Sequence, residues 1–349
     1  MPGTRIKKWS LTAQTPFRLF IIVLSIILLS GCLPVSRELC LRQRTALDIG
    51  SATMKMKTAR VDKCSKKIVG IITKKEVKVP FAENTRDQRL SRDVQDKGLE
   101  QLQALKKEAL AHGTTSFAGV ATAAFRSAAN SAQFLAEIND NLGINIRLIS
   151  QDEEAILGYM AASARTQDSS GDIVVWDIGG NSMQLILKGK DQNYRIYRGQ
   201  LASISFKNQL LEKILHRPVS AQVSPNPIGS QNLSPALEIA REAAADVPDE
   251  IKRYIRQSGT TVIGIGGVHN QSIRKQTGVA PAYRREDLLK TVKEKLDLTD
   301  AQIGGHYAET DVSNLILVLG FMQKLDIEEV QLVDVNLTDG ILIDPSFWQ

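Results

Sequence analysis

Two stretches of the sequence, LDIGSATMKM (Leu47–Met56) and VVWDIGGNSMQL (Val174–Leu185), match almost position by position. In each, an apolar run ends in Asp-Ile-Gly, a short turn with a hydroxyl residue follows, and the chain resumes at a methionine. The aspartates Asp48 and Asp177 are about 130 residues apart, which is the length of an ordinary domain. Chance similarity of two turns remains open, but strand-like alternation on both sides of each turn favours a duplicated unit.

Each copy is expected to form a β-hairpin. The first enters through RTALDIG and leaves through MKMKTARVD with strict alternation, and the second returns from its turn through MQLILKG. A Gly-Ser or Gly-Asn-Ser turn leaves backbone N–H groups pointing outward, which suits an anion. Two such loops on two similar lobes would face each other across a cleft and form a site for a polyanion. For either loop alone, a plain tight turn is the alternative.

The rest of the chain alternates helical and strand patterns, which predicts an α/β fold. Helical periodicity marks residues 93–113, 127–143, 151–165 and 235–257, and strands are expected near residues 115–122, 144–150 and 260–265. The polar stretch of residues 220–235 is interpreted as a surface loop without chemistry.

The composition is that of a folded globular protein, with 43% apolar and 23% charged residues in a chain of 349 residues. The N-terminus differs: a basic segment without acids precedes the apolar run LFIIVLSIILL, and LSGC ends at Cys32. This pattern predicts a secretory signal over residues 1–31 and resembles a bacterial lipoprotein signal, in which Cys32 is lipidated and becomes the mature N-terminus. An ordinary signal peptide or an uncleaved anchor is the alternative.

Cleavage before Cys32 changes the charge argument. It removes four basic residues and no acid, so the formal net charge falls from +6 to about +2, and the basic balance does not indicate a nucleic-acid partner. Leu33 is not the aspartate associated with inner-membrane retention, so we expect a lipid anchor in the cell envelope, in the outer rather than the inner membrane and facing the periplasm. Cys40 and Cys64 could pair in such an oxidising compartment, and they lack the CxxC spacing of a metal site.

The polar residues of the two loops are the first candidates for chemistry. An aspartate at a strand end could bind a metal or position water, or it could form only an Asx turn. Glycines let a phosphate approach the backbone closely, and a loop hydroxyl can donate a hydrogen bond to it. The candidates are Asp48, Gly50 and Ser51 in the first loop, and Asp177, Gly179, Gly180, Asn181 and Ser182 in the second.

A third candidate is a carboxylate at a strand-to-helix junction. Ser150 and Glu153 have the spacing of a capping box, which marks a helix start and explains Glu153 without a function. Glu154 lies on a different face of that helix. It could act as a general base toward water, or it could be a solvated acid stabilised by the helix dipole.

Two further positions could contact phosphate. Arg126 follows an apolar strand at an expected helix start, where a guanidinium could clamp phosphate oxygens, although a surface arginine is the alternative. Gly266 and Gly267 open a helix in IGIGGVHN, and its N-terminus could take another phosphate. A single Gly-rich turn is a weak signal.

Taken in order, these motifs resemble the exopolyphosphatase and guanosine pentaphosphate phosphohydrolase family of the actin, Hsp70 and sugar-kinase superfamily. The resemblance runs through ALDIGSATMK, ATAAFRSAAN, LISQDEEAILGYMAA, VVWDIGGNSMQL, GIGGVHN and DIEEVQLVDVNLTDGILID. It implies a two-lobed, duplicated ribonuclease H-like α/β fold with an interlobe cleft. After the signal and a linker (32–43), lobe I would span 44–155, lobe II 156–328, and a closing strand and helix 329–349.

The resemblance also implies roles. Glu154 would be the base that activates water, Asp177 would help to hold a divalent cation such as Mg2+, and Arg126 and both loops would bind phosphate. The implied activity is metal-dependent release of terminal phosphate from inorganic polyphosphate. Guanosine pentaphosphate is the alternative substrate, less suited to the cell envelope because that nucleotide is made and used in the cytoplasm. Whether the protein forms a homodimer stays open.

Two residues depart from the family pattern. Asn181 stands where the family usually has a third glycine, and Glu309 stands near the place of an expected arginine. Asparagine tolerates positive φ better than other non-glycine residues do, but its side chain would crowd a phosphate. Loss of the arginine would weaken polyanion binding. A lipoprotein that binds polyphosphate or a nucleotide without turnover is therefore the second function class.

Overall fold

The computed structural model describes residues 2–4, 37–166, 172–220 and 223–348. The apolar run of the expected signal and the expected lipidation site, Cys32, lie outside these residues. By internal contacts the chain divides into Met1–Leu41 and Arg42–Gln349, and the second unit holds the fold discussed below. Cys40 and Cys64 are each disulfide-bonded. No helix in the described part of the chain is long and apolar enough to cross a membrane.

Two mixed sheets form the framework. The first has the strand order β3-β2-β1-β6-β7, and the second has the order β10-β9-β8-β11-β13-β12. The strands of the first sheet are β1 (Leu41–Ile49), β2 (Thr53–Asp62), β3 (Lys67–Lys78), β6 (Phe117–Ala121) and β7 (Ile146–Leu148). Those of the second are β8 (Ile173–Ile178), β9 (Met183–Lys188), β10 (Tyr194–Gly199), β11 (Thr261–Ile265), β12 (Ala282–Arg284) and β13 (Glu329–Leu332). A small ladder joins β4 (Thr85–Arg86) to β5 (Arg89–Leu90).

The helices pack on both faces of these sheets. In the first half of the chain they are α2 (Arg37–Cys40), η1 (Ala82–Asn84), α3 (Arg92–Ala111), α4 (Ala123–Ser127), α5 (Ser131–Leu142) and α6 (Gln151–Arg165). In the second half they are α7 (Ser203–Gln209), η2 (Leu210–Ile214), η3 (Ser230–Asn232), α8 (Leu233–Ala245), α9 (Asp249–Arg256), η4 (Val268–Ile273), α10 (Arg274–Thr277), α11 (Arg285–Lys295), α12 (Asp300–Ile303), α13 (Ala308–Leu325), α14 (Leu337–Ile343) and η5 (Pro345–Phe347).

The two sheets repeat one topology. In each, three consecutive strands lie side by side as a meander (β1-β2-β3 and β8-β9-β10), and the next strand of the chain lies parallel to the first (β6 beside β1, and β11 beside β8). The repeated Asp-Ile-Gly motif ends the first strand of both sheets. The expectation of a two-lobed, duplicated α/β fold is therefore confirmed.

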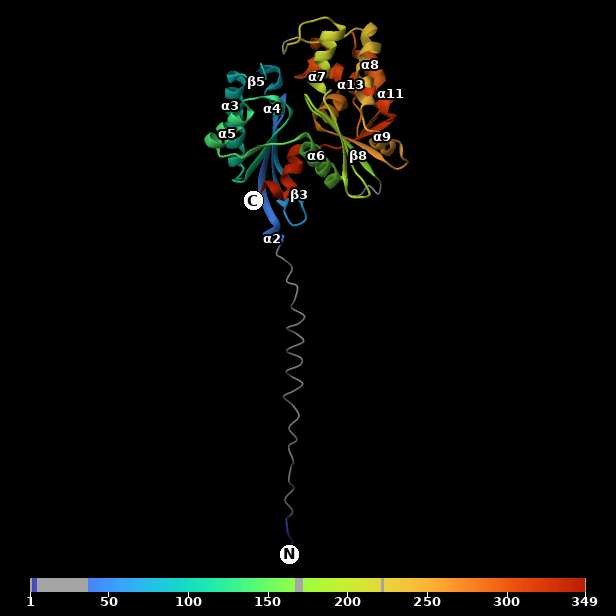
Figure 1. The fold of residues 1–349 in the computed structure, drawn as a ribbon. Helices are drawn as coiled ribbons and strands as arrows, with labels where there is room; N and C mark the ends of the chain where they lie inside the picture. Colours follow the sequence, from blue (N-terminus) through green and yellow to red (C-terminus); the bar gives the residue numbers. More distant parts are fainter. Residues whose placement is uncertain (1, 5–36, 167–171, 221–222, 349) are drawn as a thin grey trace. The chain divides into compact units, whose positions relative to one another are not determined.

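Helix α6 packs between the two sheets. Its Leu157 belongs to the apolar cluster on the inner face of the first sheet, and its Ala155, Ala161 and Ala162 belong to the cluster on the inner face of the second. Figure 1 shows α6 in green between the sheets, with the red C-terminal helix α14 near it. The outer faces carry other helices: α3 and α5 on the first sheet, and α7, α8 and α13 on the second. Because α6 touches both inner faces, it fixes side chains at its N-terminus relative to both lobes.

Helix α14 is held in this interface by close packing and by a buried ion pair. A Cβ on Gly340 would lie 2.4 Å from the carbonyl oxygen of Leu157, so only glycine allows α14 to approach α6 this closely. The next contact is electrostatic: Lys57 Nζ on β2 donates to Asp339 Oδ2 at 2.5 Å, and both side chains are buried. The C-terminal segment thus contributes a strand to the second sheet and a helix that packs against the first.

Three local expectations need correction. The helix expected over residues 235–257 is two helices, α8 and α9, because Pro248 lacks an N–H and clashes with a preceding helical turn. Arg126 lies in the last turn of the five-residue helix α4 rather than at a helix start. The lobe boundary expected at 155/156 falls inside α6, which runs unbroken from Gln151 to Arg165.

Asp339→Asn should lower the free energy of unfolding by about 3 kcal/mol, because Lys57 would remain buried without its counter-ion. Urea denaturation followed by circular dichroism measures this. The matched control is Asp334→Asn, which removes one carboxylate from the exposed pair with Lys74 and should be nearly neutral. Equal effects of the two substitutions would contradict a special contribution of the buried pair.

Candidate active site

The carboxyl ends of the central strands surround a cavity of about 70 Å3. Ten of the residues singled out in the sequence line it: Asp48, Gly50, Ser51, Glu154, Asp177, Gly179, Gly180, Ser182, Gly266 and Gly267. Arg126 and Asn181 do not line it. The two loops, the glycine turn and the candidate base thus meet at one place, although they come from four distant parts of the chain.

Sheet geometry explains the convergence. Asp48 on β1 lies opposite Val120 on β6, and Asp177 on β8 lies opposite Ile265 on β11. Parallel strands end at the same edge of a sheet, so the residue after each strand enters the same space. The residue after β11 is Gly266, and the residue at the equivalent place after β6 is Thr122, which also lines the cavity. Thr122 was not predicted from the sequence.

The two loops have the same internal geometry and face each other. The Gly50 N–H donates to the Thr53 carbonyl at 2.9 Å, and the Gly179 N–H donates to the Ser182 carbonyl at 2.9 Å. A Cβ added to Gly180 would lie 3.1 Å from Cβ of Ser51, so the loop tips of the two lobes are within van der Waals reach. An anion between them would meet backbone from both lobes.

The Glu154 carboxylate receives one hydrogen bond from each side of the cleft. Arg126 Nη1 donates to Oε2 at 2.8 Å, and the Ser182 hydroxyl donates to Oε1 at 3.3 Å. Ser150 is the N-cap of α6, and the side chain of Glu153, not that of Glu154, completes its capping box. Glu154 is 6% exposed, so it is not the solvated first-turn acid that was the alternative expectation.

Burial and neighbouring charges set the ionisation of Glu154. Desolvation raises the pKa of its carboxyl to about 7, the Arg126 guanidinium opposes that rise, and the carboxylates of Asp177 and Asp48 add to it. A carboxyl with this pKa is partly ionised at neutral pH, which is where a general base is most effective.

The two repeated aspartates lie deep in the same cavity. Burial raises the pKa of Asp177 to about 6, with Lys55 opposing the rise and Asp48 adding to it, and burial also raises the pKa of Asp48. Gly266 makes room for Asp177: it has φ +80°, and a Cβ there would lie 2.4 Å from Asp177 Oδ1. The glycine after β11 is thus needed for the position of an acid on the neighbouring strand.

Lys55 also lines this acidic cavity, and the sequence analysis did not predict it. Its Nζ lies 3.8 Å from Asp48 Oδ2, and the charges of Asp48, Glu76, Asp177 and Glu154 raise its pKa against the effect of desolvation. The alternation of MKMK contained the signal. The two methionines point into the core of the first lobe, so both lysines must point to the inner face, on the same side as Asp48.

The donor set fits a hard divalent cation. Asp48 and Asp177 supply only oxygen ligands, and Asp48 Oδ1 is buried without a hydrogen-bond partner. Within the described ranges, the carboxylates of Asp48, Asp177 and Glu154 do not approach one another closely enough to enclose an ion by themselves. Mg2+ usually keeps several waters and binds through one or two carboxylates together with substrate phosphates, which suits this arrangement.

Two residues have positions that differ from their expected roles. Arg126 lies behind Glu154, where its guanidinium also donates to the Ile149 carbonyl at 3.1 Å. Asn181 is half-buried and does not have a positive φ, so this loop needs no glycine there for its backbone. Its side chain lines neither this cavity nor the larger one beside it.

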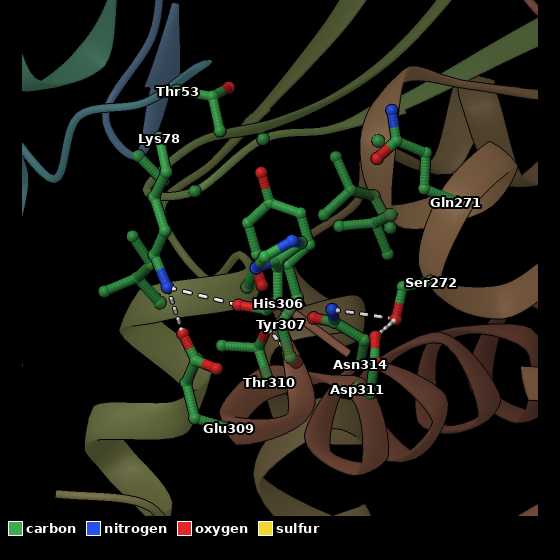
Figure 2. A pocket seen from close by; sticks show the side chains of 18 of the residues that line it. Thr53, Lys78, Gln271, Ser272, His306, Tyr307, Glu309, Thr310, Asp311 and Asn314 are labelled. Atoms are coloured by element: carbon green, nitrogen blue, oxygen red, sulfur yellow. Dashed lines mark hydrogen bonds and ion pairs between the residues drawn. The ribbon is translucent and has the colours of Figure 1, made fainter. Parts of the chain in front are cut away.

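A second cavity, of about 330 Å3, adjoins the first and shares Thr53, Lys55 and Gly179 with it. Figure 2 shows it between β3 of the first lobe and the η4 and α13 region of the second. Its floor is polar: the Ser272 hydroxyl donates to Asp311 Oδ1 at 2.6 Å, and Asn314 Nδ2 donates to the same hydroxyl at 3.2 Å. Glu309, the departure noted in the sequence, is at its mouth.

Solved structures show the same fold. The Aquifex aeolicus PPX-GPPA enzyme superposes with a TM-score of 0.67 at 17% identity, covering 87% of this chain and 99% of that one. An exopolyphosphatase from Cytophaga hutchinsonii superposes with a TM-score of 0.67 at 15% identity, covering 86% and 96%.

The family comparison covers most of the sequence. The model of the Ppx/GppA phosphatase family matches residues 59–346, a range that includes Arg126, Glu154, Asp177 and the second loop. The chain, whose two loops and Glu154 meet at one cavity, belongs to the Ppx/GppA phosphatase family.

Proposed function

We propose that the protein releases terminal phosphate from inorganic polyphosphate by hydrolysis. The main support is the position of Glu154. It is a buried carboxylate whose pKa is raised to about 7, and it lines one cavity together with the two glycine-containing loops. Family membership supports phosphatase chemistry, and the name of the Cytophaga hutchinsonii relative supports polyphosphate as the substrate.

The residues divide the work between binding and proton transfer. Backbone N–H groups of the two loops and the Ser51 hydroxyl bind the terminal phosphate, with Lys55 offsetting part of its charge, while the Ser182 hydroxyl donates to Glu154. Ionised Glu154 accepts a proton from a water molecule as the water oxygen bonds to phosphorus, and the bond to the bridging oxygen breaks toward the rest of the chain. Arg126 holds the carboxylate in place. This makes Arg126 a positioning residue rather than a phosphate ligand.

Asp177, with Asp48, would hold Mg2+ or another divalent cation. Such a cation supplies neutralisation of phosphate charge when it is bound. The unpartnered Oδ1 of Asp48 supports this assignment. Burial raises the pKa values of both carboxyl groups, and a bound cation would stabilise the ionised forms that burial disfavours.

A phosphorylated nucleotide such as guanosine pentaphosphate is the second candidate substrate. The larger cavity favours it, because its apolar wall (Ile178, Ile204, Val268) and its amide and carboxylate groups suit an organic base better than a chain of phosphates. Binding of either substrate without turnover is the remaining alternative.

Glu154→Gln should lower the rate of phosphate release about 100-fold to 10,000-fold, because the amide cannot accept the proton. The purified protein is incubated with Mg2+ and either long-chain polyphosphate or guanosine pentaphosphate, and phosphate is measured over time. Glu153→Gln is the matched control, since that neighbouring carboxylate serves the helix cap. Release that is absent from the wild type, or equal in the Glu154 variant, would reject the hydrolase; faster turnover of the nucleotide would select the second candidate.

The pH profile of kcat/KM should rise with pH through a single ionisation and then level off, because only ionised Glu154 accepts a proton. Its pKa of about 7 already includes the lowering by Arg126, and a cation at Asp177 would lower it further. Rates measured from about pH 5 to about pH 9 test this. Activity that falls as pH rises through this range would contradict the assignment of Glu154 as the base.

We also propose that the protein is lipid-anchored at Cys32 in the cell envelope. The sequence pattern at residues 1–32 is the main support, and the disulfide-bonded state of Cys40 and Cys64 agrees with an oxidising compartment. Cells expressing the full chain should incorporate radiolabelled palmitate into the protein, and Cys32→Ala should abolish the label. A labelled Cys32→Ala variant would show that the anchor is elsewhere.

A further inference from the structure

Two of the three lysines that line the larger cavity, Lys55 and Lys78, form ion pairs with acids. This cavity adjoins the candidate phosphate site, so a chain of phosphates that extends into it must find cations there. Lys55 Nζ lies 3.8 Å from Asp48 Oδ2 and Lys78 Nζ lies 2.7 Å from Glu309 Oε1, whereas the charge of Lys275 acts on Asp311 without an ion pair among the described residues. As it stands, the cavity is poorly suited to a polyanion, because its carboxylates would repel each added phosphate.

The Lys78–Glu309 pair differs from the buried Lys55–Asp48 pair in accessibility. The Lys78 and Glu309 side chains are 43% and 24% exposed, whereas those of Lys55 and Asp48 are 19% and 6% exposed. An exposed pair gains little from its attraction and exchanges partners readily. Of these two paired lysines, Lys78 is therefore the one that an incoming anion can more easily take from its acid.

The pair also lies across the cleft. Lys78 is the last residue of β3 in the first lobe, and Glu309 is in the first turn of α13 in the second. Lys78 Nζ also donates to the His306 carbonyl at 3.3 Å and lies 5.3 Å from the centre of the Tyr307 ring (Figure 2). The ammonium thus points into the mouth of the cavity.

Breaking the Lys78–Glu309 ion pair would not pull β3 away from the second lobe, because other contacts join them. Glu76, two residues before Lys78, accepts a hydrogen bond from the Tyr307 hydroxyl at 3.1 Å and another from Gln271 Nε2 at 2.9 Å. These contacts join the same strand to the same region of the second lobe. A rotation of the Glu309 side chain would leave Lys78 with only the His306 carbonyl and the Tyr307 ring as neighbours.

We propose that Lys78 binds the phosphates that follow the terminal one, and that Glu309 lowers the affinity for substrate by competing with it for Lys78. Substrate binds by exchange, in which a phosphate oxygen replaces the Glu309 carboxylate at Lys78 Nζ. The proposal rests on the proposed function for the place of the terminal phosphate. It predicts that Glu309 weakens the binding of short and long polyphosphates alike.

The test measures binding of inorganic tripolyphosphate by calorimetry. The full chain carries Glu154→Gln to prevent turnover, and it is compared with added Glu309→Gln, Lys78→Met, both together, and Asp334→Asn. Asp334 is a matched control because its pair with Lys74 also joins β3 to the second lobe but lies outside both cavities. Circular dichroism and melting curves verify that each variant is folded.

Glu309→Gln should tighten binding about fivefold to tenfold, because the anion no longer has to displace a carboxylate from Lys78. Lys78→Met should weaken it, the double variant should bind no more tightly than Lys78→Met alone, and Asp334→Asn should bind like its parent. An unchanged Kd in Glu309→Gln, an equal gain with Lys78 absent, or no binding by any form would overturn the proposal.

Turnover separates this proposal from the proposed hydrolysis. With Glu154 intact, Glu309→Gln should lower KM for tripolyphosphate and leave kcat unchanged, whereas a purely structural role would change the melting temperature without this split. If no form releases phosphate but the binding pattern appears, the exchange at Lys78 is supported and the proposed hydrolysis is rejected. If phosphate is released but Glu309→Gln alters neither Kd nor KM, the hydrolysis is supported and the exchange at Lys78 is rejected.

Discussion

The Glu154 carboxylate is buried where the two lobes meet, and it is hydrogen-bonded from both. Arg126 reaches it from the helix after β6, and Ser182 reaches it from the loop after β8. A buried carboxylate costs free energy unless such partners satisfy it, so the geometry of the cleft and the ionisation of this group depend on each other. Helix α6 makes the arrangement possible, because its small apolar side chains pack against both sheets while its first turn projects Glu154 into the cavity.

Duplication concentrates acids at the same place. Each lobe ends its first strand in an aspartate, and the parallel strand beside it ends at the same level, so Asp48, Asp177 and Glu154 share one small cavity. Burial raises the pKa values of all three, neighbouring acids add to the rise, and Lys55 opposes it at Asp48 and Asp177. In the larger cavity, Lys55 and Lys78 are likewise paired with acids. A phosphate that binds to one of these lysines must therefore replace the carboxylate with which the lysine is already paired.

Much of this site could be predicted from local patterns. The repeated Asp-Ile-Gly loops, the capping box before Glu154 and the glycine turn after β11 each have a local physical cause, and ten of the residues that they contain or flank line the cavity. Lys55 was missed because a lysine in an alternating strand is ordinarily assigned to solvent, and here that face of the strand packs against α6 and α14. Arg126 was predicted as a phosphate ligand, whereas in the fold its guanidinium donates to Glu154.

The sequence by itself determined the duplication, the α/β class and the residue types that the chemistry requires, because hydrophobic periodicity, glycine turns and helix caps act over a few neighbouring residues. Tertiary structure alone decided which charges meet. The pairing of Glu309 with Lys78, of Asp339 with Lys57 and of Glu154 with Arg126 joins segments that are distant along the chain. Electrostatic energy depends on distance and burial in three dimensions, and no local pattern records either.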